Sequence, residues 1–221
     1  SIKSAEATFG KVIMFEDKIC DARYSKSCGG ITENFENVWE GDPVPYLISV
    51  EDVDSKGTAF CSPDIVPEES LKSFIGNVDE KGQYFLWTFE PTQDELIRSL
   101  KNKHKIEATE ILQLTPEKIG NSGRIIDLRI DYKDIQNNLK SIAIHTEYEI
   151  RNIMSPSFLF SSAFSVKKNE NGNFNLIGKG WGHGVGLCQI GALGRALNGQ
   201  STENILNHYY PVSKLKRIYS S

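Results

Sequence analysis

The stretch Gly180-Trp181-Gly182-His183-Gly184-Val185-Gly186-Leu187-Cys188-Gln189-Ile190-Gly191-Ala192 says more about this chain than any other. Glycine occupies every second position from residue 178 to residue 186. Because glycine loses more backbone entropy on folding than any other residue, this density predicts left-handed dihedral angles or close approach to another surface. Residues 187–197 then read as a helix that ends near Gly199. A nucleotide-binding loop is disfavoured, since no Lys-Ser/Thr pair follows and the Gly-x-Gly-x-x-Gly order is absent.

Around this segment the chain mixes short strands with separate helices. Hairpin turns are expected at residues 16–17, 120–123 and 169–173. Helices are expected over residues 67–78, 92–104, 146–153, 187–197 and 202–208. Thr92 with Glu95, and Thr146 with Glu149, have the spacing of a capping box at a helix start. Without regular strand–helix alternation, the pattern predicts an α+β fold of several antiparallel hairpins packed with a few separate helices.

Length and composition indicate a folded domain with room for a substantial core. The 221 residues are 39% hydrophobic and 24% charged. We expect residues 63–140 to form an inserted α+β subdomain, and residues 1–62 and 141–221 to form the core domain together. No apolar run approaches the roughly 20 residues that span a bilayer. These residues contain no signal peptide, so if the chain is exported we expect its signal to lie upstream or to have been removed. The net charge of −4 argues against nucleic acid as a partner.

The cysteines leave two interpretations open. Cys20, Cys28, Cys61 and Cys188 lack Cys-x-x-Cys spacing, so a zinc site made by cysteine alone is not indicated, and we expect neither a metal nor a cofactor. Outside the cytoplasm a disulfide is permissible, and Cys28 with Cys61 is the preferred pair. Free thiols that pack as small hydrophobic groups are the equal alternative.

Two distant stretches resemble the stage II sporulation protein D/amidase enhancer family. The first is residues 180–192, followed by Ile205-Leu206-Asn207-His208-Tyr209-Tyr210-Pro211. The second is Ala22-Arg23-Tyr24-Ser25-Lys26-Ser27-Cys28-Gly29-Gly30-Ile31-Thr32-Glu33, with Val38-Trp39 and Pro45-Tyr46-Leu47 downstream. The resemblance extends from about residue 8 to residue 210, which is nearly the whole chain.

The resemblance implies a protein of the bacterial periplasm or cell envelope that processes peptidoglycan glycan strands. Its members are similar to a lytic transglycosylase acting at MurNAc–GlcNAc linkages. The family's catalytic Glu lies in an N-terminal segment, before an Ala- and Gln-rich helix, and this sequence contains neither motif. Proton delivery to the leaving oxygen contributes ~10²–10⁴-fold to such a reaction. We therefore expect the chain to supply the substrate groove without the catalytic acid. The alternative is a non-catalytic cell-wall binding module that activates an N-acetylmuramoyl amidase.

The candidate substrate-binding residues come from both matched stretches, which we expect to line one groove. They are Ser27, Gly29, Gly30, Thr32, Glu33, Tyr46, Trp181, His183, Gly184, Gln189, Tyr209 and Tyr210. His183 could bond a sugar hydroxyl or tie down its own turn, and Trp181 could support a pyranose ring or anchor the loop in the core. Glu33 is expected to bind substrate or brace its loop, with catalysis the less favoured role. Arg124 and Arg151 could hold the MurNAc lactyl carboxylate or form ordinary ion pairs.

Overall fold

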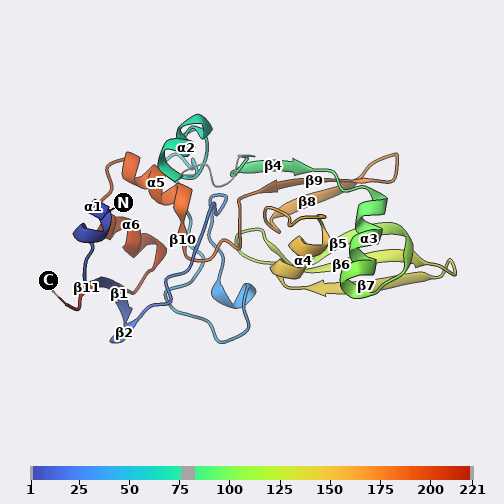
Figure 1. The fold of residues 1–221 in the computed structure, drawn as a ribbon, viewed down its shortest axis with the longest axis horizontal. Coiled ribbons are helices and arrows are strands. Elements are labelled where there is room, and N and C mark those ends of the chain that lie inside the picture. The colour runs from blue at the N-terminus through green and yellow to red at the C-terminus, as the bar shows by residue number, and fades with distance from the viewer. Residues whose placement is uncertain (1, 76–82, 220–221) are drawn as a thin grey trace.

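The computed structural model describes residues 2–75 and 83–219, which form two lobes side by side (Figure 1). The helices are α1 (Ile2–Ala7), the 3₁₀ helix η1 (Phe35–Asn37), α2 (Glu68–Ile75), α3 (Gln93–His104), α4 (Glu147–Ile153), α5 (Gln189–Leu197) and α6 (Thr202–Tyr209). The strands are β1 (Lys11–Phe15), β2 (Lys18–Ile19), β3 (Tyr24–Ser25), β4 (Leu86–Phe89), β5 (Ala108–Ile119), β6 (Ile125–Asp134), β7 (Leu139–His145), β8 (Phe164–Lys168), β9 (Phe174–Lys179), β10 (Leu187–Cys188) and β11 (Lys214–Arg217). The predicted α+β class is confirmed.

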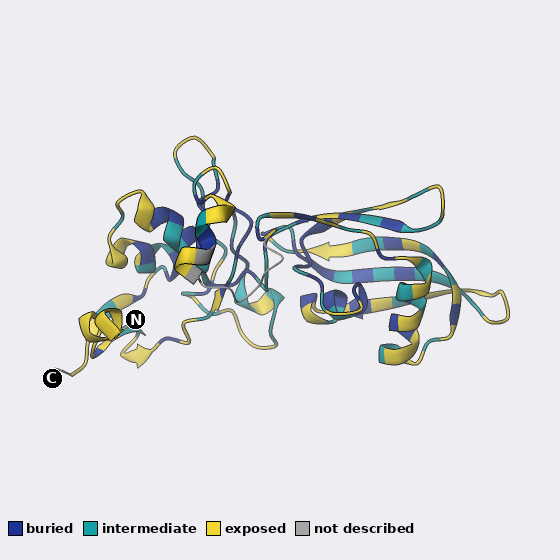
Figure 2. Ribbon diagram, turned by 45° about the horizontal axis from the view of Figure 1, so that its top comes forward, coloured by how far each residue is buried: buried dark blue, intermediate teal, exposed yellow. Residues whose placement is uncertain are grey.

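The first lobe contains both ends of the chain and little regular structure. Strand β1 pairs with β2 and with β11, so the first and last strands lie side by side. A second, two-stranded sheet joins β3 and β10 in parallel. Helices α5 and α6 cover a core that includes Leu47, Val185, Ile190 and Tyr209. Figure 2 shows that α1 and β2 are exposed at the edge of this lobe.

The second lobe is built from two three-stranded antiparallel sheets. Their strand orders are β5-β6-β7 and β4-β9-β8. Helices α3 and α4 contact the β5–β7 sheet. The core of this lobe includes Trp87, Leu100, Ile130 and Leu176. Buried positions line the strands of this lobe in Figure 2. Buried and more exposed residues alternate along β4 and β9, which places one face of their sheet on the core.

The three expected hairpins are confirmed, and their turns follow local chemistry. Glu16 and Asp17 both take positive φ, 47° and 59°, in the two-residue loop between β1 and β2. Such loops favour left-handed turn residues because their twist matches that of the strands. The other two hairpins join β5 to β6 and β8 to β9.

Both expected helix starts are also confirmed. The Thr92 side chain accepts from the Glu95 N–H, and the Glu95 carboxylate accepts from the Thr92 N–H, which completes a capping box on α3. Thr146 accepts from the Glu149 N–H and caps α4. Each cap satisfies donors that the first turn of a helix leaves without partners.

Some elements differ from the expectation. The helix α1 was not predicted, and residues 187–188 pair as a strand before helix α5 begins. Helix α2 covers Glu68–Ile75 of the expected 67–78, and residues 76–78 lie outside the described residues.

The core of the second lobe extends beyond the expected subdomain. It unites residues from Trp87 to Leu176, so the segment containing β7, α4, β8 and β9 packs with β5 and β6. The division at residues 62/63 and 140/141 stays a prediction. Among the described residues, no helix has the length and apolar character needed to cross a membrane.

Candidate functional site

The structure brings the two matched stretches together. Leu187 and Cys188 pair with Tyr24 and Ser25 in the β3–β10 sheet. Beyond it, Ser27 and Trp181 exchange backbone hydrogen bonds of 3.1 and 2.8 Å. The two stretches therefore form one continuous unit, although 160 residues separate Cys28 from Cys188.

Both reasons for the glycine density apply in this unit. Gly180, Gly182, Gly184 and Gly186 all have positive φ, between 71° and 95°, which side chains with a Cβ rarely adopt. A Cβ on Gly184 would also lie 2.4 Å from Cζ of Arg124. The segment is thus both left-handed at alternate residues and pressed against a neighbouring side chain.

Arg124 holds the two stretches to each other from the start of β6. Its fully buried guanidinium donates to the Gly182 carbonyl at 2.9 and 3.1 Å, to the Cys28 carbonyl at 3.2 Å and to the Ser27 carbonyl at 3.5 Å. Burial lowers the pKa of Arg124 from its usual value. Because the guanidinium is buried among carbonyls, it serves as a hub between backbone segments. Arg151, by contrast, pairs with Glu147 at 3.3 Å.

Glu33 connects the N-terminal stretch to the β5–β6 turn. Its side chain is fully buried, and Oε1 accepts from the Asn34 N–H at 2.9 Å, the Asn37 Nδ2 at 2.8 Å and the Asn121 N–H at 3.2 Å. Oε2 accepts from the Ser122 N–H at 3.0 Å and the Ser122 hydroxyl at 2.5 Å. A Cβ on Gly120 would come within 2.3 Å of this carboxylate. These contacts favour the brace among the roles considered for Glu33.

His183 lies at the edge of the unit, with its ring against Trp39. The ring centroids are 4.8 Å apart, and Nδ1 accepts from the Val185 N–H at 3.1 Å. Burial, together with the nearby Arg124, Arg151 and Arg23, lowers the pKa of His183 to about 4. The imidazole is therefore neutral at pH 7, with Nδ1 as acceptor for its own turn and Nε2 left to carry the proton.

Aromatic neighbours flank Trp181. Its ring lies 4.7 Å from Phe160 and 5.0 Å from Tyr84 between centroids. The Trp181 side chain is half-buried, so these contacts anchor the loop while part of the indole stays accessible. On the Trp39 side, the Arg23 guanidinium lies 3.9 Å from the ring centroid, within the range of a cation–π contact.

Three other predicted site residues have hydroxyl groups that form hydrogen bonds within the protein. The Thr32 hydroxyl accepts from the Val50 N–H at 2.8 Å, the Tyr46 hydroxyl accepts from the Asp21 N–H at 3.1 Å, and the Tyr210 hydroxyl donates to the Arg23 carbonyl at 2.8 Å. Buried members of the set are Ser27, Gly29, Gly30, Thr32, Gly184, Tyr209 and Tyr210, whereas Tyr46 and Gln189 are half-buried. Substrate binding by this set stays a prediction.

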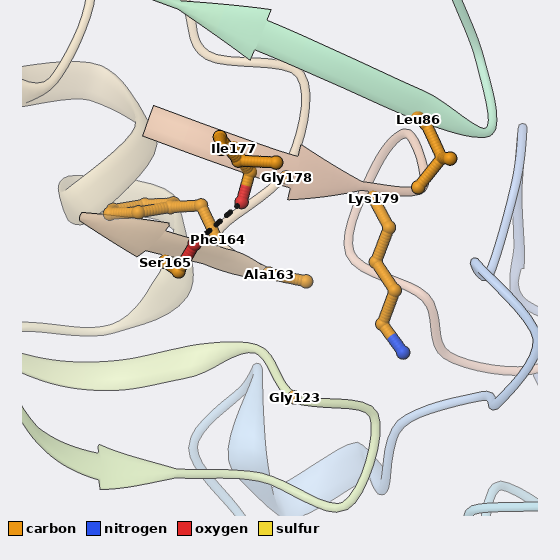
Figure 3. A pocket seen from close by; sticks show the side chains of 8 residues that line it. All are labelled: Leu86, Gly123, Ala163, Phe164, Ser165, Ile177, Gly178 and Lys179. Atoms are coloured by element: carbon orange, nitrogen blue, oxygen red, sulfur yellow. Dashed lines mark hydrogen bonds between the residues drawn. The ribbon is translucent and has the colours of Figure 1, made fainter. Parts of the chain in front are cut away.

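A pocket that the sequence did not reveal opens beside the assembled stretches. It has a volume of about 270 Å³ and is lined by Leu86, Gly123, Ala163, Phe164, Ser165, Ile177, Gly178 and Lys179. Figure 3 shows the Lys179 side chain extending from the end of β9 toward the β5–β6 turn that carries Gly123. A Cβ on Gly29 would lie 3.2 Å from Cγ of Lys179, so the pocket borders the N-terminal stretch. Within the described part of the chain, the Lys179 ammonium has no hydrogen-bond or ion-pair partner. In the sequence, the feature that points to this pocket is the lysine directly before Gly180.

The cysteines are free thiols in the structure. The Sγ atoms of Cys28 and Cys61 lie 3.8 Å apart, well beyond the roughly 2.05 Å of a disulfide. Burial raises the pKa of Cys28 and of Cys188. Hydrogen bonds from these two side chains lower the pKa of Cys61. Of the two interpretations left open by the sequence, the structure shows the packed thiols.

Comparisons with known proteins agree with the resemblance. A family model described as a domain of unknown function, DUF8618, matches residues 33–186. An uncharacterized protein of Brachyspira hyodysenteriae is 30% identical over 208 residues, covering 94% of this chain and 46% of that protein. The amidase enhancer of Bacillus subtilis is 28% identical over 236 residues, covering 96% of this chain and 32% of that protein. The stage II sporulation protein D of Bacillus amyloliquefaciens is 27% identical over 208 residues, covering 92% of this chain and 47% of that protein.

This chain spans less than half the length of each of these relatives. The family model covers more than half of the chain, and the named relatives match over nearly all of it. The predicted resemblance to stage II sporulation protein D and the amidase enhancer is confirmed, and the chain belongs to the DUF8618 family.

Proposed function

We propose that this chain is the glycan-binding part of a cell-envelope protein that processes peptidoglycan, with the Lys179 pocket as one contact point for the strand. The observation that carries the proposal is the joining of the two matched stretches beside a pocket with an unpaired cation. Lys179 is suited to the lactyl carboxylate of MurNAc, because an unpaired ammonium next to apolar walls gains a charge-assisted hydrogen bond. The apolar walls, including Leu86 and Phe164, suit the non-polar face of a sugar ring.

Cleavage of the strand by a lytic transglycosylase-like reaction is the finer part of the proposal. Such a reaction needs a carboxylic acid that can deliver a proton to the leaving oxygen. The carboxylate of Glu33 accepts hydrogen bonds from the backbone or side chains of Asn34, Asn37, Asn121 and Ser122, which supports a bracing role. We therefore expect the acid to come from residues outside this chain.

Binding can be tested with purified, peptide-free glycan strands. Lys179→Met should weaken binding about tenfold, since one charge-assisted contact is worth about 1.4 kcal/mol. Lys214→Met is the matched control, because Lys214 is exposed on β11 in the other lobe. Equal affinities of the wild type and the Lys179 variant for the glycan would show that Lys179 does not contribute to binding. The chain alone should release no anhydro-MurNAc ends, and their appearance would contradict the expected absence of a catalytic acid.

A second candidate is activation of an N-acetylmuramoyl amidase. It is favoured by the name of the amidase enhancer of Bacillus subtilis, which aligns with 96% of this chain. The test is the turnover of a purified cell-wall amidase on intact peptidoglycan, with and without an equimolar amount of this chain. An increase that persists in Lys179→Met would separate amidase activation from glycan binding at the pocket.

A further inference from the structure

Three thiols and a carboxylate meet at one point inside the first lobe. The Sγ atoms of Cys28, Cys61 and Cys188 and a carboxylate oxygen of Asp52 all lie within 4.8 Å of one another. The four side chains are at most 2% exposed. They come from separate places: the N-terminal stretch, the loop over residues 52–61 and the start of helix α5.

The distances approach those of a tetrahedral metal site. Zn–S bonds of about 2.3 Å and Zn–O bonds of about 2.1 Å place two sulfur ligands about 3.8 Å apart, and sulfur and oxygen about 3.6 Å apart. The structure has 3.8 Å between the sulfur atoms of Cys28 and Cys61, and 3.4 Å between the Cys28 sulfur and Oδ2 of Asp52. Since no pair is more than 4.8 Å apart, an ion at the centre would need the widest pair to close by at most about 1 Å to reach this geometry.

Backbone donors already point at two of the sulfur atoms. The Gly30 N–H lies 3.3 Å from the Cys28 sulfur. The Cys188 sulfur accepts from the Cys28 N–H at 3.1 Å and from the Gly191 N–H at 3.2 Å. Such outer contacts stabilise the negative charge on a thiolate and fix its orientation toward a metal.

The Asp52 carboxylate is also oriented by a neighbouring donor, with one oxygen bonded to Arg195 and the other facing the thiols. Its Oδ1 accepts from Nε of Arg195 at 2.9 Å, whereas Oδ2 faces the thiols. Gly191 gives this arrangement room, because a Cβ there would lie 2.1 Å from Oδ2 of Asp52. The Arg195 charge also offsets part of the excess negative charge that three thiolates and a carboxylate bring to one ion.

We propose that Cys28, Asp52, Cys61 and Cys188 bind one Zn²⁺ ion in a closed structural site. Three thiolates select a soft or borderline ion over Mg²⁺ or Ca²⁺. Four buried protein ligands leave no open position for a water or substrate, which distinguishes this site from a catalytic zinc centre. When the Zn–S bonds form, the three thiol protons pass to solvent, so binding weakens as the pH falls.

The ion gives this lobe a cross-link that its secondary structure lacks. Between β3 and α2, residues 26–67 contain one regular element, the three-residue helix η1. Zn²⁺ would join this irregular segment at three points to the start of α5, directly after the glycine-rich stretch. A lobe held in this way depends on the ion for part of its folding free energy.

The test uses the full chain, prepared reduced and loaded with Zn²⁺ or Co²⁺. We expect about one equivalent of Zn²⁺ per chain, and Co²⁺ should give thiolate charge-transfer bands with the strong visible bands of tetrahedral coordination. Cys61→Ser should lower the affinity for Zn²⁺ by at least about 100-fold. Cys20→Ser is the matched control, because Cys20 is also buried and free but lies outside the cluster.

A second measurement uses only the wild-type chain, so it does not require a variant to fold. Alkylation of the wild-type chain, followed by peptide mapping, should leave Cys28, Cys61 and Cys188 protected in Zn²⁺ and modified at least about tenfold faster after chelation. Three results would each overturn the proposal. The reduced wild-type chain could take up no Zn²⁺, or freshly isolated protein could contain a Cys28–Cys61 disulfide. Alternatively, Cys20→Ser could lose as much affinity for Zn²⁺ as Cys61→Ser.

Discussion

Replacing Glu33 by Gln separates a structural brace from a catalytic acid. The change keeps the shape of the side chain but turns one acceptor oxygen into a donor NH₂ group. The least disruptive orientation retains the amide oxygen where Oε1 accepts from the Asn34 and Asn121 N–H groups and the Asn37 side chain. The NH₂ group then faces Ser122, whose hydroxyl can rotate to accept but whose N–H cannot.

The expected loss follows from these contacts. One buried N–H without a partner costs about 1–3 kcal/mol. The three retained bonds lose their charged acceptor, which costs a further ~0.5–1 kcal/mol each. We expect Glu33→Gln to lower the free energy of unfolding by about 4 kcal/mol, or Tm by roughly 8–16 °C for a chain of this size.

Thermal unfolding and amide hydrogen exchange measure this loss. The Ser122 amide should be protected in the wild type and exchange much faster in Glu33→Gln, because it loses its acceptor. The Asn121 amide keeps an acceptor that is no longer charged, so it should exchange moderately faster. Glu36→Gln is the matched control, since Glu36 lies exposed in the same 3₁₀ helix that follows Glu33, and it should change stability by less than about 0.5 kcal/mol. If Glu33→Gln instead abolished an activity while the Tm and both amides stayed unchanged, the bracing argument would be refuted.

Two further predictions concern the glycine-rich stretch. Gly184→Ala should lower the free energy of unfolding in urea at least twice as much as Gly172→Ala. Both glycines have φ above +80°, so both substitutions strain the backbone. Only the new Cβ at residue 184 would meet Arg124, 2.4 Å away. The left-handed conformation alone costs about 1–2 kcal/mol, so equal losses would contradict the packing of Arg124 against this segment. The pKa of His183 is about 4 in the folded state, below the ~6.5 of an unfolded chain. The unfolded chain therefore binds a proton more readily between these two values. The free energy of unfolding contributed by this group is fully present above about pH 6.5 and falls by at most about 3 kcal/mol toward pH 4. His183→Gln should flatten that pH dependence, and an NMR titration midpoint near 6.5 would disprove the shift.

Local chemistry explains what the sequence predicted well. The capping box at Thr92 and the N-cap at Thr146 need only residues three positions apart. The hairpin turns are set by residues that tolerate left-handed backbone. The glycine density likewise signalled an unusual backbone before any partner was known. That the partner is Arg124 could not be predicted, because its contacts join residues that lie between 58 and 97 positions apart in the chain.

The same limit applies to the cysteine cluster. Spacing rules for metal sites look for ligands a few residues apart, whereas these four ligands stand at positions 28, 52, 61 and 188. Cys28 and Cys61 are neighbours, as expected for the preferred disulfide pair, and their sulfur atoms are free thiols, as in the equal alternative. The third sulfur and the carboxylate reach the cluster only through the β3–β10 pairing and the loop after residue 50. Long-range pairing decides such a site, and one sequence does not reveal it.

The pairing of β1 with β11 has a practical consequence for anyone handling the protein. Because Lys11 lies opposite Arg217, polypeptide attached at either extremity would emerge from the same pole, remote from the β5–β7 sheet (Figure 1). A short linker could therefore join the two extremities, and new ends could be opened at the exposed β8–β9 loop around Gly172. A permuted chain made in this way would leave the Lys179 pocket and the sulfur cluster intact.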